Sequence, residues 1–293
     1  MYYIIYSLLW LLSILPFRVL YIISDAIYGI VFYVFKYRRD VVFKNLAIAF
    51  PEKTVEERYK IAKQFYHNLI DTFIETIKFI TISKKQILQR SSADFTVINE
   101  LLSKGHNVHI MAGHQFNWEY GNLQCSLHLS VPFIGIYMPI ANKHLDRIFY
   151  KFRKQFGTVL IPATDYKKNV FHPAFASQHT VGIAADQNPG DPHNAYWMHF
   201  FSKPAPFVTG PARGAVKKNT AIVMVRMKKI KRGHYYFNAT LVEEFAGGLT
   251  PAALTLRYKN ALEQIIREDP ANYLWSHRRW KFDWQPAYGE IIG

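Results

Sequence analysis

The sequence predicts an α/β fold: a central mixed, largely parallel sheet flanked by helices, preceded by an N-terminal membrane helix or helical hairpin. Between residues 107 and 218, short apolar runs alternate with amphipathic runs, which is typical of strand–helix units in a parallel sheet. Two later strand-like runs are joined by a short basic turn, which favours an antiparallel hairpin at one side of the sheet. We expect an anchor at residues 1–40 and one globular domain at residues 41–293.

The anchor is predicted from two apolar runs, residues 2–15 and 19–35, separated by Pro16 and Arg18. Each run is at or below the roughly 20 residues that a straight membrane-spanning helix needs. Because no basic stretch precedes them and no small-residue cleavage site follows, we expect a retained anchor, either one span or a hairpin dipping into one leaflet. The alternative is a pair of buried core helices. The basic residues that follow place the rest of the chain in the cytoplasm by the positive-inside rule; they are Lys36, Arg38, Arg39 and Lys44.

The globular part begins with a long helix through Phe79, because Thr54 and Glu57 have the spacing of a capping box. Hydrophobic periodicity predicts further helices at residues 95–102, 118–129, 142–156, 167–177, 209–218 and 250–267, and strands at residues 108–111, 131–137, 159–162, 180–184, 221–227 and 235–242. Residues 200–206, rich in aromatic residues and proline, are predicted to be a loop, and residues 228–233 a turn.

The chain is strongly basic, with 36 Lys and Arg against 21 Asp and Glu and a formal charge of +15. Its partners are therefore expected to be anionic: nucleic acid, acidic lipid or an acidic carrier protein. Its single cysteine, Cys125, excludes an intramolecular disulfide framework and is typical of a reducing compartment.

The main candidate site is His114, which lies with Gly113 between a predicted strand and the helix that carries Glu119. Residues five apart in one helix point about 140° apart, so His114 can meet Glu119 only from the turn before the helix. A carboxylate that fixes one tautomer of an imidazole makes it a general base. The alternative is that His114 caps the helix and Glu119 is a solvated acid of its first turn.

A covalent nucleophile and a metal site have little support. Cys125 lies inside a helical pattern, and the chain has no G-x-S-x-G motif, no H-E-x-x-H motif and no cysteine cluster. Direct attack by a substrate hydroxyl is the simpler hypothesis.

Three other polar stretches are open to two interpretations each. The basic helix at residues 142–156 is either a solvated face or a source of arginines for the carboxyl edge of the sheet, and Asp186 and Gln187 form either a turn or part of a site there. In the tail, residues 275–281, two arginines lie between two tryptophans, which suits either single-stranded nucleic acid or a lipid- or phosphate-facing patch.

At this point the chain resembles the bacterial lipid A secondary acyltransferases, the lauroyl and myristoyl transferase group within the lysophospholipid acyltransferase superfamily with its H-x4-D/E motif. Six blocks in the same order carry the resemblance: residues 37–52, 113–119, 136–157, 185–190, 200–215 and 273–281. Position 119 is Glu where many superfamily members have Asp, and Gly214 stands where a bulkier residue is common.

The resemblance implies that residues 41–293 are an acyltransferase domain, with His114 as general base and Glu119 as its partner, while Arg153, Asp186 and Gln187 help to hold substrate. It implies transfer of a fatty acyl chain from acyl carrier protein to a hydroxyl of a lipid A precursor at the inner face of the cytoplasmic membrane, without metal, cofactor or nucleic acid. The alternatives are a lysophospholipid or amino-acid-derived lipid as acceptor and, from a different class, a membrane-anchored nucleic-acid-binding protein without catalysis.

Overall fold

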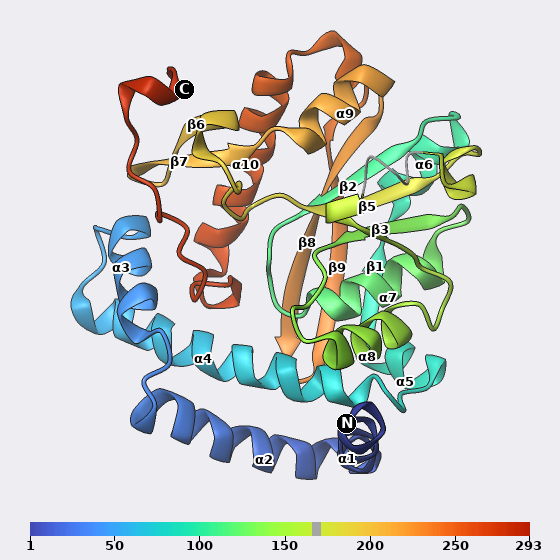
Figure 1. Cartoon of the computed structure of the whole chain (residues 1–293), viewed down its shortest axis with the longest axis vertical. Helices are drawn as coiled ribbons and strands as arrows, with labels where there is room; N and C mark the ends of the chain where they lie inside the picture. Colours follow the sequence, from blue (N-terminus) through green and yellow to red (C-terminus); the bar gives the residue numbers. More distant parts are fainter. Residues whose placement is uncertain (166–170) are drawn as a thin grey trace.

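The structure is a computed structural model that describes residues 1–165 and 171–293. Within these residues a seven-stranded sheet forms the centre, in the order β1-β9-β8-β2-β5-β3-β4 (Figure 1). The strands are β1 Ser91–Asp94, β2 Val108–Ala112, β3 Phe133–Tyr137, β4 Val159–Pro162, β5 Thr180–Ala184, β8 Ala221–Lys231 and β9 His234–Glu243. Neighbouring strands are parallel except β8 and β9, which pair antiparallel. The prediction of a mixed, largely parallel sheet is confirmed.

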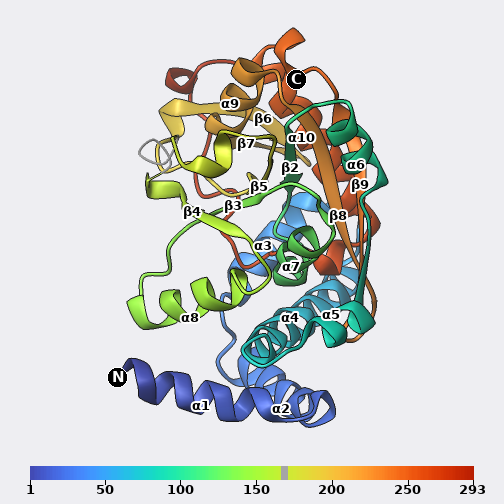
Figure 2. The ribbon, with the colours of Figure 1, turned by 90° about the vertical axis from the view of Figure 1, so that its right-hand side faces the viewer.

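Both faces of the sheet are covered, because successive buried residues of β8 belong to two different cores. Ile222 and Met224 belong to a core shared with α9 Gly210–Lys218 and α10 Pro251–Glu268. Val223 and Val225 belong to a second core on the opposite face. That face is covered by α5 Lys84–Arg90, α6 Thr96–Ser103, α7 Trp118–His128 and α8 Lys143–Arg153, and Figure 2 shows α7 and α8 on one side of the sheet and α9 and α10 on the other. Because successive strand residues point to opposite faces, one strand supplies both cores.

The N-terminal residues form α1 Tyr2–Ile14, α2 Phe17–Gly29 with a π-helical end at Ile30–Val34, and α3 Arg39–Ala49. Figures 1 and 2 show α1 and α2 meeting in a corner, both beside the long helix α4 Val55–Lys78. Residues Phe17–Val34 are long and apolar enough to cross a membrane, with a mean hydropathy of 1.6, and 22% of them are buried. The predicted apolar N-terminal helix is therefore present, with one face on the domain and one face open.

Several predicted elements have different limits in the structure. Residues 200–206 are not a loop: β6 Ala195–Phe200 and β7 Lys203–Val208 form an antiparallel hairpin, joined by β10 Ile291–Ile292 in a second sheet. Pro204 and Pro206 are tolerated because β7 is an edge strand, where the missing N–H groups break no ladder bond. The loop prediction was wrong because it took prolines and aromatics as breakers, whereas Phe200 and Phe207 are buried.

Three further differences are smaller. The predicted helix at residues 167–177 lies partly outside the described residues, and its described end contains a single 3-10 turn, Pro173–Phe175, because proline restricts the residue before it. The predicted turn at residues 228–233 is shorter, since β8 extends through Lys231 and Gly233 supplies the positive φ of 72°. Short elements α3, α5 and β1 were not predicted; β1 pairs with β9, so the β8–β9 hairpin is not at the sheet edge.

Candidate active site

His114 follows the carboxyl end of β2 in a loop that the C-terminal segment holds in place. Gly113 approaches α10 so closely that a Cβ there would lie 2.4 Å from Leu262 Cδ1, so a larger residue would have to displace the Leu262 side chain. The His114 carbonyl accepts from the Leu274 N–H at 3.0 Å, and the Phe116 N–H donates to the Asn272 carbonyl at 3.1 Å. The loop therefore has a fixed path without belonging to a helix or strand.

Asp186 is the carboxylate that contacts the His114 ring. It follows β5, the neighbour of β2 in the sheet, so the two strand ends bring these residues together. Asp186 Oδ1 lies 2.6 Å from His114 Nδ1, and Oδ2 accepts from the His114 backbone N–H at 2.9 Å. Asp186 is 1% exposed, whereas the His114 side chain is 23% exposed. A buried carboxylate thus holds an imidazole whose outer edge stays open.

Gln187 lies on the other side of the ring, with its Nε2 3.2 Å from His114 Nε2. An ionised Asp186 can only accept, so Nδ1 carries the proton and Nε2 presents its lone pair, to which the Gln187 amide donates. This tautomer, assigned from the hydrogen-bond network, is the one that a general base needs.

The pKa values agree with this pairing. Burial lowers the pKa of His114, but the charge and hydrogen bond of Asp186 outweigh burial, and the more distant Glu119 adds to them, so the net shift is upward. Burial raises the pKa of Asp186, yet the charge and hydrogen bonds of His114 bring it down to about 2. Asp186 therefore remains ionised beside the imidazole at neutral pH.

Glu119 forms a second pair, with Arg153 from the end of α8. Arg153 Nε lies 2.9 Å from Glu119 Oε2, and its Nη2 bonds Oε1, so the guanidinium binds the carboxylate through two nitrogens. The Trp118 indole N–H also donates to Oε1, at 3.1 Å, and its ring centroid lies 5.6 Å from that of His114. Glu119 is 2% exposed and its backbone N–H donates to Asn117 Oδ1, which caps α7.

All five predicted site residues therefore lie in one region, in two groups. His114, Asp186 and Gln187 form one group, and Glu119 and Arg153 form the other. Among the described residues no hydrogen bond joins His114 to Glu119. The predicted roles in substrate binding and catalysis stay predictions, and the structure adds Asp186 as the residue on Nδ1 and Asn117 as the cap beneath Glu119.

Both tryptophans of the tail, and one of its arginines, are buried. Trp275 and Trp280 are 0% and 6% exposed, and Arg279 is 1% exposed. The tryptophan rings pack against Phe50 and Phe200, so neither offers a face for stacking on a base. Base stacking on these tryptophans, on which the nucleic-acid interpretation of the tail depends, is therefore not supported, because both rings belong to the core.

Comparison with known proteins identifies the family. The family model described as bacterial lipid A biosynthesis acyltransferase matches residues 1–282. The chain belongs to this family. The resemblance carried by the six sequence blocks is thereby confirmed, and acyl transfer is the activity that the family's description names.

Curated lipid A acyltransferases are similar over most of the chain. The lipid A biosynthesis lauroyltransferase of Escherichia coli K12 is 23% identical over 94% of this chain and 89% of its own length. The palmitoleoyltransferase of the same organism is 22% identical with the same coverage. A lipid A biosynthesis acyltransferase of Haemophilus influenzae is 24% identical over 83% of this chain and 78% of its own length.

Proposed function

We propose that this chain transfers a fatty acyl group from the thioester of an acyl carrier protein to a hydroxyl of a lipid A precursor, at the cytoplasmic side of the inner membrane. The family and the names of its relatives support acyl transfer to lipid A. The single observation that carries the chemistry is the His114 ring, whose Nδ1 is fixed by Asp186 while Nε2 lies at the partly open edge.

The proposed reaction begins when the acceptor hydroxyl replaces Gln187 at His114 Nε2. Nε2 takes the hydroxyl proton as the oxygen attacks the thioester carbon, and Asp186 stabilises the imidazolium that forms. When the tetrahedral intermediate collapses, the C–S bond breaks, and the imidazolium returns the proton to the leaving thiolate. The products are the ester and the free carrier thiol.

The region beside Arg153 suits an acyl chain and an acidic carrier. An apolar cavity of about 290 Å³ lies between α1 and α8, and its lining includes Tyr6, Ile148 and Phe152. The outer face of α8 is basic, and Arg147 lies over the Tyr2 ring at 4.3 Å. We propose that the carrier docks near α8 and that its acyl chain enters between α8 and α1.

The membrane placement rests on α1 and α2. Exposed apolar side chains cover their outer faces: Tyr3, Ile4, Leu8, Trp10, Leu11, Ile14, Val19, Ile22, Ile30, Tyr33 and Val34. Because the polar face of α2 packs on α4, we propose that these helices embed their outer faces in the bilayer and hold the site at the level of the lipid headgroups. Lys36, Arg38 and Arg39 follow them, which favours the cytoplasmic side.

The acceptor is tested by mass spectrometry of lipid A and polar lipids from the source organism with and without the gene. We expect lipid A to lose one secondary acyl chain, and the mass difference to give the chain length. If lipid A is intact and another ester lipid loses a chain, the acceptor is wrong; a lysophospholipid or an amino-acid-derived lipid would then take its place.

The base is tested by returning variants to the deletion strain. His114→Ala should leave the acyl chain missing, because it removes the Nε2 lone pair that takes the proton in the proposed reaction. His128→Ala is the matched control, since His128 is an exposed histidine at the far end of α7 and should restore the chain. Equal restoration by both variants would exclude His114 as the base.

A further inference from the structure

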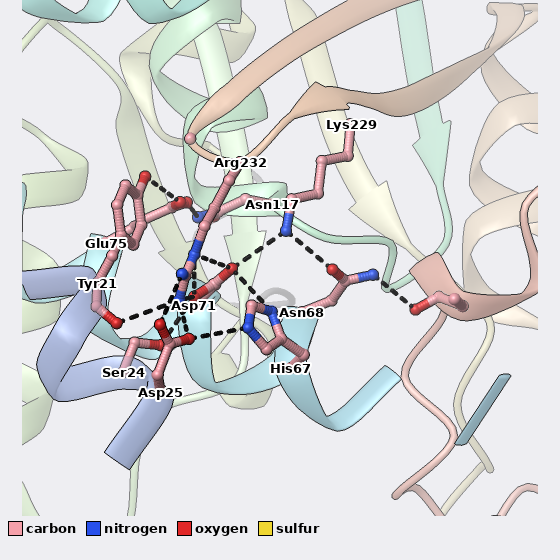
Figure 3. Close-up of polar contacts among 12 residues, drawn as sticks. Tyr21, Ser24, Asp25, His67, Asn68, Asp71, Glu75, Asn117, Lys229 and Arg232 are labelled. Carbon is pink, nitrogen blue, oxygen red and sulfur yellow. Dashed lines mark hydrogen bonds and ion pairs between the residues drawn. The ribbon is translucent and has the colours of Figure 1, made fainter. Parts of the chain in front are cut away.

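Glu75 is a fully buried carboxyl group that the proposed reaction does not use. It lies on α4 and is 0% exposed. Three side chains from three other segments donate to it. Tyr21 of α2 and Asn117 of the loop before α7 each donate at 2.9 Å (Figure 3). Tyr235 of β9 donates at 2.7 Å. A buried polar group with this many partners links separate parts of a fold.

Asn117 carries the link into the active site. It is 0% exposed, and its Nδ2 donates to Glu75 while its Oδ1 accepts from the Glu119 N–H. Because Glu75 offers an acceptor at this point, the amide is held in one orientation; the opposite orientation would face oxygen with oxygen at Glu75 and N–H with N–H at Glu119. Glu75 therefore sets the cap of α7 and, through it, the position of the Glu119 carboxylate that binds Arg153.

The same carboxyl group connects this cap to the N-terminal helices. Tyr21 comes from α2, and its hydroxyl fills the space over Gly233, where a Cβ would lie 1.9 Å from it. One turn earlier on α4, the buried Asp71 accepts from Ser24 of α2 at 2.8 Å and from Arg232 at 2.7 Å. Figure 3 shows these contacts as one continuous group between α2, α4 and the β8–β9 turn. These contacts fix the position of α2 against α4, the helix that carries Glu75.

Burial has a chemical consequence for Glu75. Burial raises the pKa of its carboxyl group, while the hydrogen bonds from Tyr235 and Asn117 oppose the rise without cancelling it. A glutamine side chain has nearly the same shape as glutamate and keeps one acceptor oxygen, so Glu75→Gln can preserve the hydrogen bond to Asn117.

We propose that Glu75 is a positioning residue for acyl transfer: it orients Asn117, and through Asn117 the Glu119–Arg153 pair, and its bond to Tyr21 ties this geometry to the docking of α2. The inference rests on the proposed function for its activity readout. Glu75 touches no reacting atom, so its removal should lower kcat in folded enzyme more than it raises KM for the acyl donor.

The test compares Glu75→Leu, Glu75→Gln and Asn117→Ala in purified full-length protein in detergent micelles. Misplacement of a catalytic group by about 1 Å costs about 100-fold, so Glu75→Leu and Asn117→Ala should each lower kcat by tens-fold to about 100-fold. Glu75→Gln should stay within about threefold of wild type because the acceptor remains. Thr76→Val is the matched control: Thr76 is buried next to Glu75, and among the described residues its hydroxyl bonds only within α4, so this variant should lower Tm and leave kcat unchanged.

The pathway through Asn117 is tested by the double variant Glu75→Leu with Asn117→Ala. If Glu75 acts through Asn117, the double variant should be no slower than the slower single variant, since residues in one network are not additive. Tyr21→Phe should lower kcat in the same direction by about threefold, the loss of one hydrogen bond, and add nothing to Asn117→Ala. The proposal would be overturned if the rate losses of the two single variants multiplied in the double variant, or if Asn117→Ala kept the wild-type kcat. The Asn117→Ala result is decisive even if Glu75→Leu does not fold.

A readout without activity separates this inference from the proposed function. The Glu119 N–H has Asn117 Oδ1 as its partner, so amide hydrogen exchange of residues 117–121 should quicken in Asn117→Ala and Glu75→Leu but not in Glu75→Gln or Thr76→Val. If wild-type enzyme transfers no acyl chain to lipid A precursor while exchange follows this pattern, the function is wrong and the positioning stands. If wild type is active, His114→Ala is inactive and exchange is unchanged throughout, only the positioning is wrong.

Discussion

Two buried carboxylates, Asp186 and Glu119, lie in the same site and each holds one cation-forming partner, but the partners differ. Asp186 holds His114, a titratable ring that is 23% exposed on its side chain. Glu119 holds Arg153, a permanently charged group bound through two of its nitrogens and only 16% exposed. The first pair can pass a proton to a substrate, whereas the second can only fix charge and position. The chemistry open to each carboxylate therefore depends on the side chain that it binds, more than on how far the carboxylate lies from His114 along the chain.

The largest effect is expected from Asp186→Asn. Without the carboxylate, neither the Nδ1 proton nor the imidazolium is stabilised, so kcat should fall by the order of 10³-fold or more. The measurement is single-turnover acyl transfer in purified enzyme. The prediction fails if the variant keeps more than a tenth of the wild-type rate, because Asp186 would then be a substrate contact or a structural acid rather than the orienting group.

Glu119→Gln should have the next largest effect, with a different signature. It leaves Arg153 buried without its counterion, which typically costs about 3 to 5 kcal/mol of stability, at the lower end here since the guanidinium is partly exposed. We expect kcat to fall by about 100-fold through misplacement, and adding Arg153→Met to restore stability but not activity. Thermal unfolding of the single and double variants checks the first part, and their kcat the second. Stability that is not restored would show that the two residues are not coupled.

How far the sequence predicts this site can be judged from the same two carboxylates. The pattern of strand followed by turn predicted His114 and Asp186 at strand ends, and the resemblance assigned both to the site. What the sequence could not supply was the order of strands, in which β5 is the neighbour of β2. That adjacency, and not the five-residue spacing, brings Asp186 to Nδ1, since Glu119 is turned towards α8 by Arg153.

The fold shows the same limit. Periodicity found the long helices and the buried strands, because burial of one or both faces leaves a clear pattern. It missed β1, which consists of four polar or small residues at the edge of the large sheet. It also missed the β6–β7 hairpin, because β7 contains prolines; an edge strand tolerates them where the N–H group would not bond a neighbouring strand. It also could not place Glu75 beside Asn117, because these residues are 42 positions apart and no sequence pattern predicts a contact made only in the folded chain.

The pH dependence of kcat/KM should also distinguish the two carboxylates. His114 must be neutral to accept a proton, and its pKa is raised above the ordinary value of about 6.5 for an imidazole. The kcat/KM should therefore fall as the pH is lowered through this raised pKa. Asp186→Asn removes the charge that raises the pKa of His114 and leaves the burial that lowers it. The acid limb of the variant's residual activity should therefore move to lower pH. In Glu119→Gln the limb should move much less, since Glu119 is a smaller contributor than Asp186.

The smallest effect is expected at Gln187, whose amide lies 3.2 Å from His114 Nε2. Gln187→Ala removes one neutral hydrogen bond, which is worth about 0.5 to 1.5 kcal/mol, so kcat/KM should change by about tenfold or less. Gln187→Glu should do more harm although it is closer in shape, because a carboxylate at Nε2 stabilises the second ring proton and keeps the base charged at higher pH. Its acid limb should move upward, opposite to that of Asp186→Asn. Identical pH profiles for the two Gln187 variants would show that this amide does not face the reactive nitrogen in the working enzyme.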